Sequence, residues 1–181
     1  MPSSTLTTER LKLRPWRDED LEPWAAMNAD PRVREFFVNT LTVDESARQM
    51  RNFSDDIERQ GFGLWAVEVT DGAPFIGFIG LTGASFFADF MPGIEIGWRL
   101  ACPHWGHGYA TEGARAALTY GFESLGLKEI VATTAVGNQR SRRVMERLGM
   151  TRNPADDFEH PNVPEGHPLR RHVLYRIRAD R

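Results

Sequence analysis

The feature that most constrains the fold of this 181-residue chain is a glycine turn between an apolar strand pattern and a long amphipathic helix pattern. The strand pattern runs from Ile94 to Leu100, and the turn reads Trp-Gly-His-Gly-Tyr-Ala over residues 105–110. Gly106 and Gly108 can adopt backbone angles that a Cβ disfavours, so successive N–H groups can converge on one anion. The following helix adds the positive end of its dipole. The sequence therefore predicts an anion-binding turn and a ligand that carries a diphosphate.

Strand and helix patterns continue along the whole chain. Acidic residues 18–20 predict the start of a helix that packs Trp24 and Met27 inward, and a second helix is predicted from Val43 to Gln60, ended by Gly61. Asp71-Gly72 predicts a hairpin turn. A further helix is predicted from Asn138 to Leu148. The other predicted strands are Leu11 to Pro15, Leu64 to Val69, Phe75 to Leu81, Ile130 to Ala135 and His172 to Ile177.

Two segments of the sequence resemble the GCN5-related N-acetyltransferases (GNAT), in particular the RimJ/RimL-type branch. The pyrophosphate loop of that family reads Arg or Gln, two residues, Gly, one residue, then Gly or Ala. Trp105, Gly108 and Ala110 fall on the fixed positions, with an aromatic residue in the first place. The stretch from Asn138 to Met150 resembles the family segment that receives the pantetheine arm. The resemblance runs from about Leu6 to Arg178.

This resemblance implies an α/β architecture, the GNAT fold. That fold has a mixed, largely antiparallel sheet of six to seven strands, flanked by about four helices, with one splayed strand pair that binds acetyl-CoA. A hydrophobic content of 41% over 181 residues suits one domain with a sizeable core. We therefore expect residues 1–181 to form a single N-acetyltransferase domain.

The resemblance also implies which residues bind acetyl-CoA. The turn anchors the diphosphate, free backbone amides of the splayed strand bind the pantetheine and the thioester oxygen, and the residue at 138 binds the pantetheine amide. The residues of the turn are Gly106, His107, Gly108, Tyr109, Ala110 and Thr111. The amides of the splayed strand belong to Trp98, Arg99 and Leu100, and the residue at 138 is Asn138. Asn is also a preferred helix N-cap, so a structural role for Asn138 stays open. Four arginines at 140, 142, 143 and 147 could meet the outer phosphates or form a solvated basic face.

The catalytic residues are less clearly marked. Many family members carry, seven residues after the Asn, a Tyr that acts as the general acid and protonates the departing thiolate. Here that position is Met145. Ser141 is our candidate for protonating the departing thiolate, with an exposed first-turn serine as the alternative. Glu95 is our first candidate for the general base, with a simple ion pair to Arg99 or another cation as the alternative. Weaker candidates for the base are His160, His167 and His172.

Two irregular segments are expected near the acceptor. The connection from Pro31 to Leu41 carries Phe36, Phe37 and Asn39, and by resemblance it forms a wall of the acceptor pocket, unless its aromatics only pack. The proline-rich stretch from Asp156 to Pro168 either covers part of that pocket or is a solvated connector. A further loop with three phenylalanines is expected from Ala84 to Gly93.

The resemblance implies an acetyl-CoA-dependent N-acetyltransferase. It would transfer an acetyl group to a primary amine, which is either a protein N-terminal α-amine or the amine of a small molecule. The amine would attack the thioester directly in a ternary complex. The alternative is a noncatalytic acyl-CoA-binding module, which would need neither Glu95 nor Ser141. A Rossmann dinucleotide site is disfavoured because Thr111 stands where that fingerprint needs its third glycine.

Charge and composition give no support for several classes of partner and ligand. The net charge of −3 and pI near 6.0 favour neither nucleic acid nor an anionic membrane as a partner. Cys102 is the only cysteine, so no intrachain disulfide can form, and His104 and His107 have no clear partner ligands, so no metal is predicted. The start of the chain lacks signal-peptide features, so we expect a cytoplasmic protein. We expect it to be a monomer or a homodimer.

Overall fold

The computed structural model describes residues 5–83 and 93–179. In these residues nine strands form one sheet, in the order β1-β2-β3-β4-β5-β6-β9-β7, with β8 also paired to β9. Every pair is antiparallel except β5 and β6. The strands are β1 (Leu6–Thr7), β2 (Leu11–Arg14), β3 (Leu64–Val69), β4 (Gly77–Gly83), β5 (Ile94–Leu100), β6 (Glu129–Ala135), β7 (Thr151–Arg152), β8 (Phe158–Glu159) and β9 (Arg171–Arg178).

The sheet therefore has more strands than the six to seven we expected. The additional ones, β1, β7 and β8, are two residues long, which is too short to produce a hydrophobic alternation in sequence. β8 lies inside the stretch from Asp156 to Pro168, where the prolines predicted no regular strand. The expected loop from Ala84 to Gly93 lies, apart from Gly93, outside the described residues.

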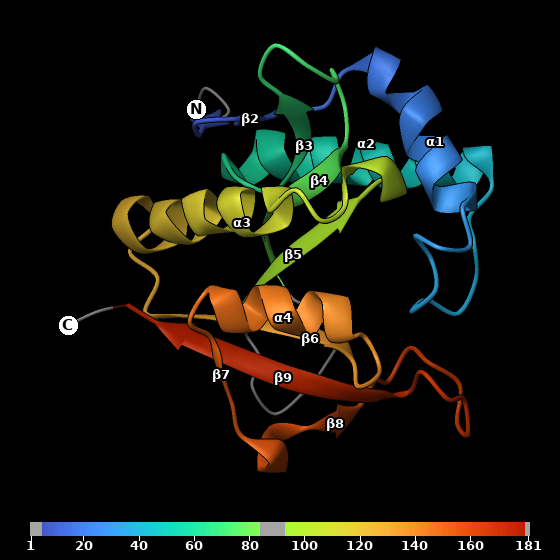
Figure 1. Cartoon of the computed structure of the whole chain (residues 1–181), viewed down its shortest axis with the longest axis vertical. Coiled ribbons are helices and arrows are strands. Elements are labelled where there is room, and N and C mark those ends of the chain that lie inside the picture. Colours follow the sequence, from blue (N-terminus) through green and yellow to red (C-terminus); the bar gives the residue numbers. More distant parts are fainter. Residues whose placement is uncertain (1–4, 84–92, 180–181) are drawn as a thin grey trace.

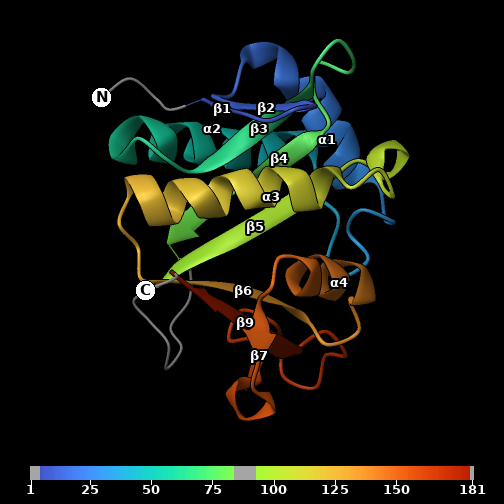
Figure 2. The same ribbon diagram turned by 60° about the vertical axis from the view of Figure 1, so that its left-hand side comes forward.

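Within the described ranges, four α-helices flank the sheet, on both of its faces (Figures 1 and 2). Figure 1 shows α3 and α4 in front of the sheet, with α2 behind β3 and β4. α2 begins with a capping box between Thr42 and Glu45 and ends at Gly61, whose φ of 79° is the left-handed conformation that glycine tolerates. The helices are α1 (Leu21–Ala29), α2 (Val43–Gln60), α3 (Tyr109–Thr119) and α4 (Gln139–Arg147).

α3 packs very closely on the sheet. A Cβ added to Gly113 would lie 2.5 Å from Cδ1 of Ile79 in β4, so any larger residue here would force the Ile79 side chain to move. Trp24 and Met27 of α1 are buried, as predicted. The close contact of α3 fixes the position of the glycine turn that precedes it.

The sheet opens between β5 and β6. β4 and β5 pair along their whole length, from Gly77 opposite Leu100 to Gly83 opposite Ile94. β5 and β6 pair only at Glu95 and Val131, and beyond that point the two strands diverge (Figure 1). This is the splayed pair that the resemblance implied, and its open end lies next to the glycine turn.

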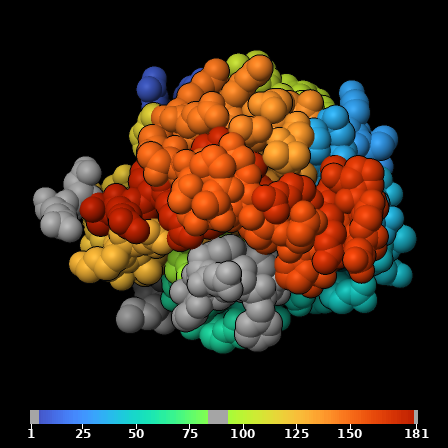
Figure 3. Space-filling model, turned by 90° about the horizontal axis from the view of Figure 1, so that it is seen from below, coloured from blue at the N-terminus to red at the C-terminus, as the bar shows by residue number. Residues whose placement is uncertain are grey.

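The C-terminal third of the chain makes up most of the face seen from below (Figure 3). It includes β9 and the connection that carries β8. None of the helices within 5–83 and 93–179 is both long and apolar enough to cross a membrane.

Candidate functional site

A cleft of about 900 Å³ lies where β5 and β6 diverge. Its walls come from β5, the glycine turn, the end of β6, the start of α4, the segment 31–42 and the connection after β8. Of the predicted site residues, those that line the cleft are Glu95, Trp98, Arg99, Leu100, Gly106, Gly108, Tyr109, Ala110, Thr111, Asn138 and Ser141. His107 is the predicted residue that does not line it.

The glycine turn has the geometry of an anion-binding site. Gly106 and Gly108 have φ of 80° and 82°, and Gly108 is the N-cap of α3 with no side chain capping the helix. The first helical hydrogen bond runs from the N–H of Glu112 to the carbonyl of Gly108. The N–H groups of Tyr109 and the two residues after it therefore have no acceptor within the helix. They lie at the cleft, where a diphosphate would accept these hydrogen bonds.

The turn is braced from both sides. Trp105, which replaces the Arg or Gln of the family loop, donates from Nε1 to the carbonyl of Leu100 at 2.7 Å. Arg10, at the start of β2, donates from Nη1 to the carbonyl of His107 at 3.1 Å. The His107 ring stacks on Tyr109. His107 thus contributes to the shape of the turn rather than to the surface of the cleft.

Backbone amides of β5 face the opening in the sheet. The N–H of Ala101 donates to the carbonyl of Ile76, and backbone groups in an antiparallel pair point to the partner strand at every second residue. Arg99 therefore directs its backbone to β4, whereas Trp98 and Leu100 direct theirs to the gap. Of the three amides predicted for the pantetheine and thioester, only those of Trp98 and Leu100 are available there.

Glu95 lies at the point where β5 leaves β6. Its Oε1 accepts hydrogen bonds from Oγ1 of Thr133 at 2.6 Å and from the Thr133 N–H at 3.2 Å. No cation of the described residues lies within 4 Å of its carboxylate, so the ion pair with Arg99 that we considered is not formed there. Burial raises the pKa of Glu95, and the two Thr133 hydrogen bonds oppose this shift. The result is a carboxylate that is a stronger base than an exposed Glu.

Asn138 and Ser141 meet at the start of α4. Asn138 accepts from the N–H of Ser141 at 3.2 Å as the N-cap, and its Nδ2 donates to Oγ1 of Thr134 at 2.9 Å. The capping role is therefore present, and the contact with the pantetheine stays a prediction. Met145, at the position of the family's Tyr, is buried, and Ser141 is half-buried; both residues line the cleft.

Comparison with known proteins gives the family of the chain. A family model described as an acetyltransferase (GNAT) domain matches residues 10–151. The chain belongs to the GNAT acetyltransferases. It is 35% identical over 159 residues to the FsC-acetyl coenzyme A-N(2)-transacetylase of Aspergillus fumigatus, a match that covers 81% of this chain and 65% of that protein.

Solved structures show the same fold. A crystal structure of an acetyltransferase from Agrobacterium tumefaciens superposes with a TM-score of 0.78 at 27% identity, covering 99% of this chain and 96% of that one. RimL, a ribosomal L7/L12 alpha-N-protein acetyltransferase solved with coenzyme A, has a TM-score of 0.76 at 13% identity, covering 97% of this chain and 98% of RimL. This GNAT chain is therefore an acetyl-CoA-dependent acetyltransferase with a RimL-like fold.

The two irregular segments expected near the acceptor both contribute residues to the lining of this cleft. Phe36, Phe37 and Asn39 line it, and Phe37 is 41% exposed, so it is not an ordinary core residue. His160 and His172 line it too, with ring centroids 4.7 Å apart.

The pKa values of both histidines lie below the ordinary value of the side chain. Burial, with a contribution from His172, lowers the pKa of His160 to about 4. Burial also lowers the pKa of His172, whose Nδ1 lies 3.1 Å from the carbonyl of Arg170. A carbonyl only accepts, so Nδ1 carries the proton and Nε2 has the free lone pair. His167, the third candidate, does not line the cleft.

The arginines of α4 have different surroundings. Arg140 pairs with Glu35 at 2.5 Å and packs 4.5 Å from the centroid of the Trp105 ring, which ties α4 to segment 31–42. Arg142 donates to the carbonyl of Val136. Arg143 and Arg147 line the cleft with no carboxylate of the described ranges within 4 Å, so these two are the ones free to meet phosphate.

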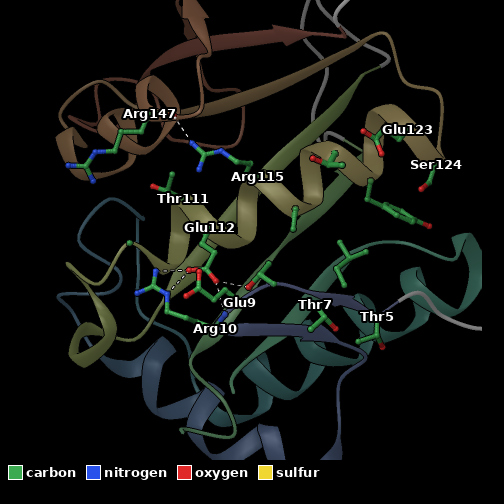
Figure 4. Close-up of a pocket in the computed structure, with 16 residues that line it drawn as sticks. Thr5, Thr7, Glu9, Arg10, Thr111, Glu112, Arg115, Glu123, Ser124 and Arg147 are labelled. Carbon is green, nitrogen blue, oxygen red and sulfur yellow. Dashed lines mark hydrogen bonds and ion pairs between the residues drawn. The ribbon is translucent and has the colours of Figure 1, made fainter. Parts of the chain in front are cut away.

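A second hollow of about 840 Å³ lies on the outer side of α3 (Figure 4). It shares Gly108, Thr111 and Arg147 with the cleft, so the two hollows adjoin at the glycine turn. Glu112 crosses it toward the start of β2. Its Oε1 accepts from Oγ1 of Thr8 at 2.6 Å and from the Arg10 N–H at 2.9 Å, and its Oε2 accepts from Nε of Arg10 at 2.7 Å.

Sequence reasoning missed Arg10 and Glu112. They are 102 positions apart, and no local pattern signals such a contact. Within the described residues, no group of three His, Cys, Asp or Glu side chains is arranged to hold a metal ion.

Proposed function

We propose that this acetyltransferase acts on a primary amine, either a protein N-terminal α-amine or a small molecule, by direct attack in a ternary complex. The observation that carries this proposal is the opening between β5 and β6. It joins the uncapped start of α3 on one side to Glu95 and the aromatic segment on the other, so donor and acceptor can be present together. The Aspergillus relative, whose name specifies an N(2) position, supports a nitrogen acceptor.

Acetyl-CoA supplies the reactive thioester. The N–H groups of Tyr109, Ala110 and Thr111 would hold its diphosphate, and the N–H groups of Trp98 and Leu100 would hold the pantetheine and the thioester oxygen. One well-placed donor to such an oxygen contributes about 3–4 kcal/mol of transition-state stabilisation. Backbone donors fixed by the β4–β5 ladder are suited to this role because they need no reorganisation.

Two side chains would handle the protons. Glu95 would accept the proton of the attacking amine through a water, because its second carboxylate oxygen accepts no hydrogen bond from the described residues. Ser141 would donate to the departing sulfur, because the residue lines the cleft and its N–H, not its hydroxyl, serves the helix cap.

The modest base favours an amine of low pKa. Neutralising an α-amine of pKa about 7.7 to 8.0 at pH 7 costs about 1 kcal/mol, whereas a lysine of pKa about 10.4 costs about 4 to 5 kcal/mol. A carboxylate that acts through water suits the smaller demand. We therefore favour α-amines and weakly basic small molecules over protein lysines.

The test is acetyl-CoA-dependent thiol release with a panel of N-terminal peptides, amino acids, polyamines and aminoglycosides, alongside direct calorimetric binding of acetyl-CoA. We expect saturable binding and turnover with one acceptor class, and a background rate without acceptor. Binding without transfer to any amine would refute the amine proposal and favour a noncatalytic acyl-CoA-binding role. Absence of binding would refute the assignment of the glycine turn.

A further inference from the structure

The acceptor side of the cleft contains a guanidinium with no counter-charge. Arg99 points from β5 on the same strand face as Glu95, and it lines the cleft. Its Nη1 donates to Oδ1 of Asn28 at 2.8 Å. Its Nε is fully buried and has no acceptor in the described structure. No carboxylate of residues 5–83 or 93–179 lies within 4 Å of this side chain.

Aromatic rings surround the Arg99 guanidinium. Its central carbon lies 4.4 Å from the centroid of Phe37 and 5.2 Å from those of Trp24 and Phe78. Cation–π contacts stabilise a cation but leave its charge and its N–H donors unneutralised. Burial, with a smaller contribution from Arg34, lowers the pKa of Arg99 to about 9, so the group is still charged at pH 7. An unpaired charge of this kind destabilises a fold and is typical of a binding site.

The guanidinium is held in place from the side away from the cleft. Asn28 is completely buried, and its Nδ2 donates to Oγ of Ser46 at 3.2 Å. Ser46, also buried, donates in turn to the carbonyl of Thr42 at 2.8 Å. This chain of hydrogen bonds positions one edge of the Arg99 guanidinium, and no hydrogen bond of the described residues occupies Nη2.

A second arginine adds to the positive charge. Arg34 packs 4.1 Å from the centroid of the Phe37 ring, donates from Nε to the carbonyl of Asn39, and lines the cleft. Burial lowers its pKa to about 10, opposed by the charge of Glu45. Arg34 and Arg99 thus both contact Phe37 in the acceptor wall, which makes this wall cationic although the chain as a whole is acidic.

We propose that the acceptor carries a carboxylate in addition to its amine, and that Arg99 pairs with this carboxylate, assisted by Arg34. A carboxylate matches the planar donor fork of arginine and supplies the acceptors that the guanidinium lacks. Arg99 is then a specificity-determining residue. Glu95 and Arg99 are four residues apart on one strand, about 13 Å at roughly 3.3 Å per residue, which leaves room for the acceptor between base and guanidinium. This inference rests on the proposed amine acetylation.

The experiment compares matched acceptors that differ only in the carboxylate. One arm uses free amino acids against their primary amides. The other uses peptide amides with Asp or Glu in the first two positions against the same peptides with Asn or Gln. Rates are expressed per neutral amine, because amidation alters the pKa of the amine. We expect kcat/KM to be at least tenfold higher for the acid in one arm, and the arm that responds identifies the source of the carboxylate.

The variant Arg99→Gln should abolish this preference while leaving the affinity for coenzyme A unchanged. Arg59→Gln, an exposed arginine of α2 paired with Asp56, is the matched control and should keep the preference. Arg99→Lys keeps the charge but loses the planar fork, and should retain only part of the preference. Circular dichroism checks that the variants fold.

Failure of this inference is distinguishable from failure of the proposed function. Equal rates for acids and amides in both arms would overturn the carboxylate pairing while amine acetylation stands. If no acceptor is acetylated, calorimetric binding of the same acids in the presence of coenzyme A still decides the pairing. Binding that Arg99→Gln abolishes supports it, and equal or absent binding in both proteins overturns it.

Discussion

Replacing Glu95 with Gln tests the proposed general base with little change in shape. The Oε1 of a Gln can still accept both hydrogen bonds from Thr133, so the local structure should be kept. Only the ability to take a proton is lost. General-base catalysis contributes about 10²- to 10⁴-fold to a rate, which corresponds to about 2.7 to 5.5 kcal/mol of activation free energy. We expect kcat to fall by a factor in this range.

The pH dependence gives a second readout. A base must be ionised to act, and burial raises the pKa of Glu95 above its ordinary value, so kcat of the wild type should rise with pH through a limb above pH 4.5. Glu95→Gln should lack this limb. The stability should respond in the opposite sense. Because the folded protein disfavours the ionised form, wild-type Glu95 reduces stability once pH exceeds the pKa of the unfolded chain, so Glu95→Gln should be at least as stable at pH 7 to 8.

The assay is thiol release from acetyl-CoA between pH 5 and 9 with a saturating acceptor, together with urea denaturation of each protein. Glu58→Gln, an exposed residue of α2 outside the cleft, is the control and should match the wild type. A Glu95→Gln variant that keeps both kcat within about twofold and the acid limb would remove Glu95 from the mechanism. Loss of rate together with loss of folding would refute the argument that the two Thr133 bonds survive.

Three further perturbations have defined outcomes. Gly108→Ala and Gly61→Ala each force a left-handed backbone on a residue with a Cβ, which should lower the free energy of unfolding by about 1–2 kcal/mol. Only Gly108→Ala should also weaken the binding of coenzyme A in calorimetry. Equal affinity of the two variants for coenzyme A would refute the role of the turn. Asp20→Ala removes the buried partner of the Arg14 guanidinium, which is 3% exposed and keeps Glu68 as a second carboxylate, and should cost about 1–3 kcal/mol in urea denaturation; an unchanged stability would contradict this. Ser141→Ala should lower kcat without changing the affinity for coenzyme A, because the helix cap uses the backbone N–H of Ser141; an unchanged kcat would leave Ser141 as an ordinary first-turn residue.

Local signals predicted the elements that carry the cofactor side of the cleft. The strand from Ile94 to Leu100 and the helix from Val43 to Gln60 have the predicted bounds. The alternation of the strand, and the capping box and terminal glycine of the helix, are local signals that each involve only a few neighbouring residues. The splay itself followed from the family resemblance. The left-handed conformation of Gly106 and Gly108 could be predicted for the same reason, and binding of a diphosphate there stays a prediction.

Contacts between distant segments could not be predicted. The hydrogen bond that holds Arg99 joins it to Asn28, 71 positions earlier, and nothing in either neighbourhood signals the other. The same holds for Arg10 and the carbonyl of His107, 97 positions apart. The direction of each β5 amide also depends on the register with β4, which the sequence does not reveal.

The brace between Arg10 and the glycine turn links the beginning of the chain to cofactor affinity. Arg10 bonds to Glu112 in the first turn of α3 (Figure 4). Thr8 also bonds to Glu112, and Arg10 also donates to the carbonyl of His107. The shape of the glycine turn, our proposed phosphate-binding loop, is thus set in part by residues that lie about a hundred positions before it in the sequence. If the turn binds coenzyme A as we propose, we expect an affinity tag or a fusion that disturbs residues 8–10 to change the Kd for coenzyme A without altering a residue of the cleft.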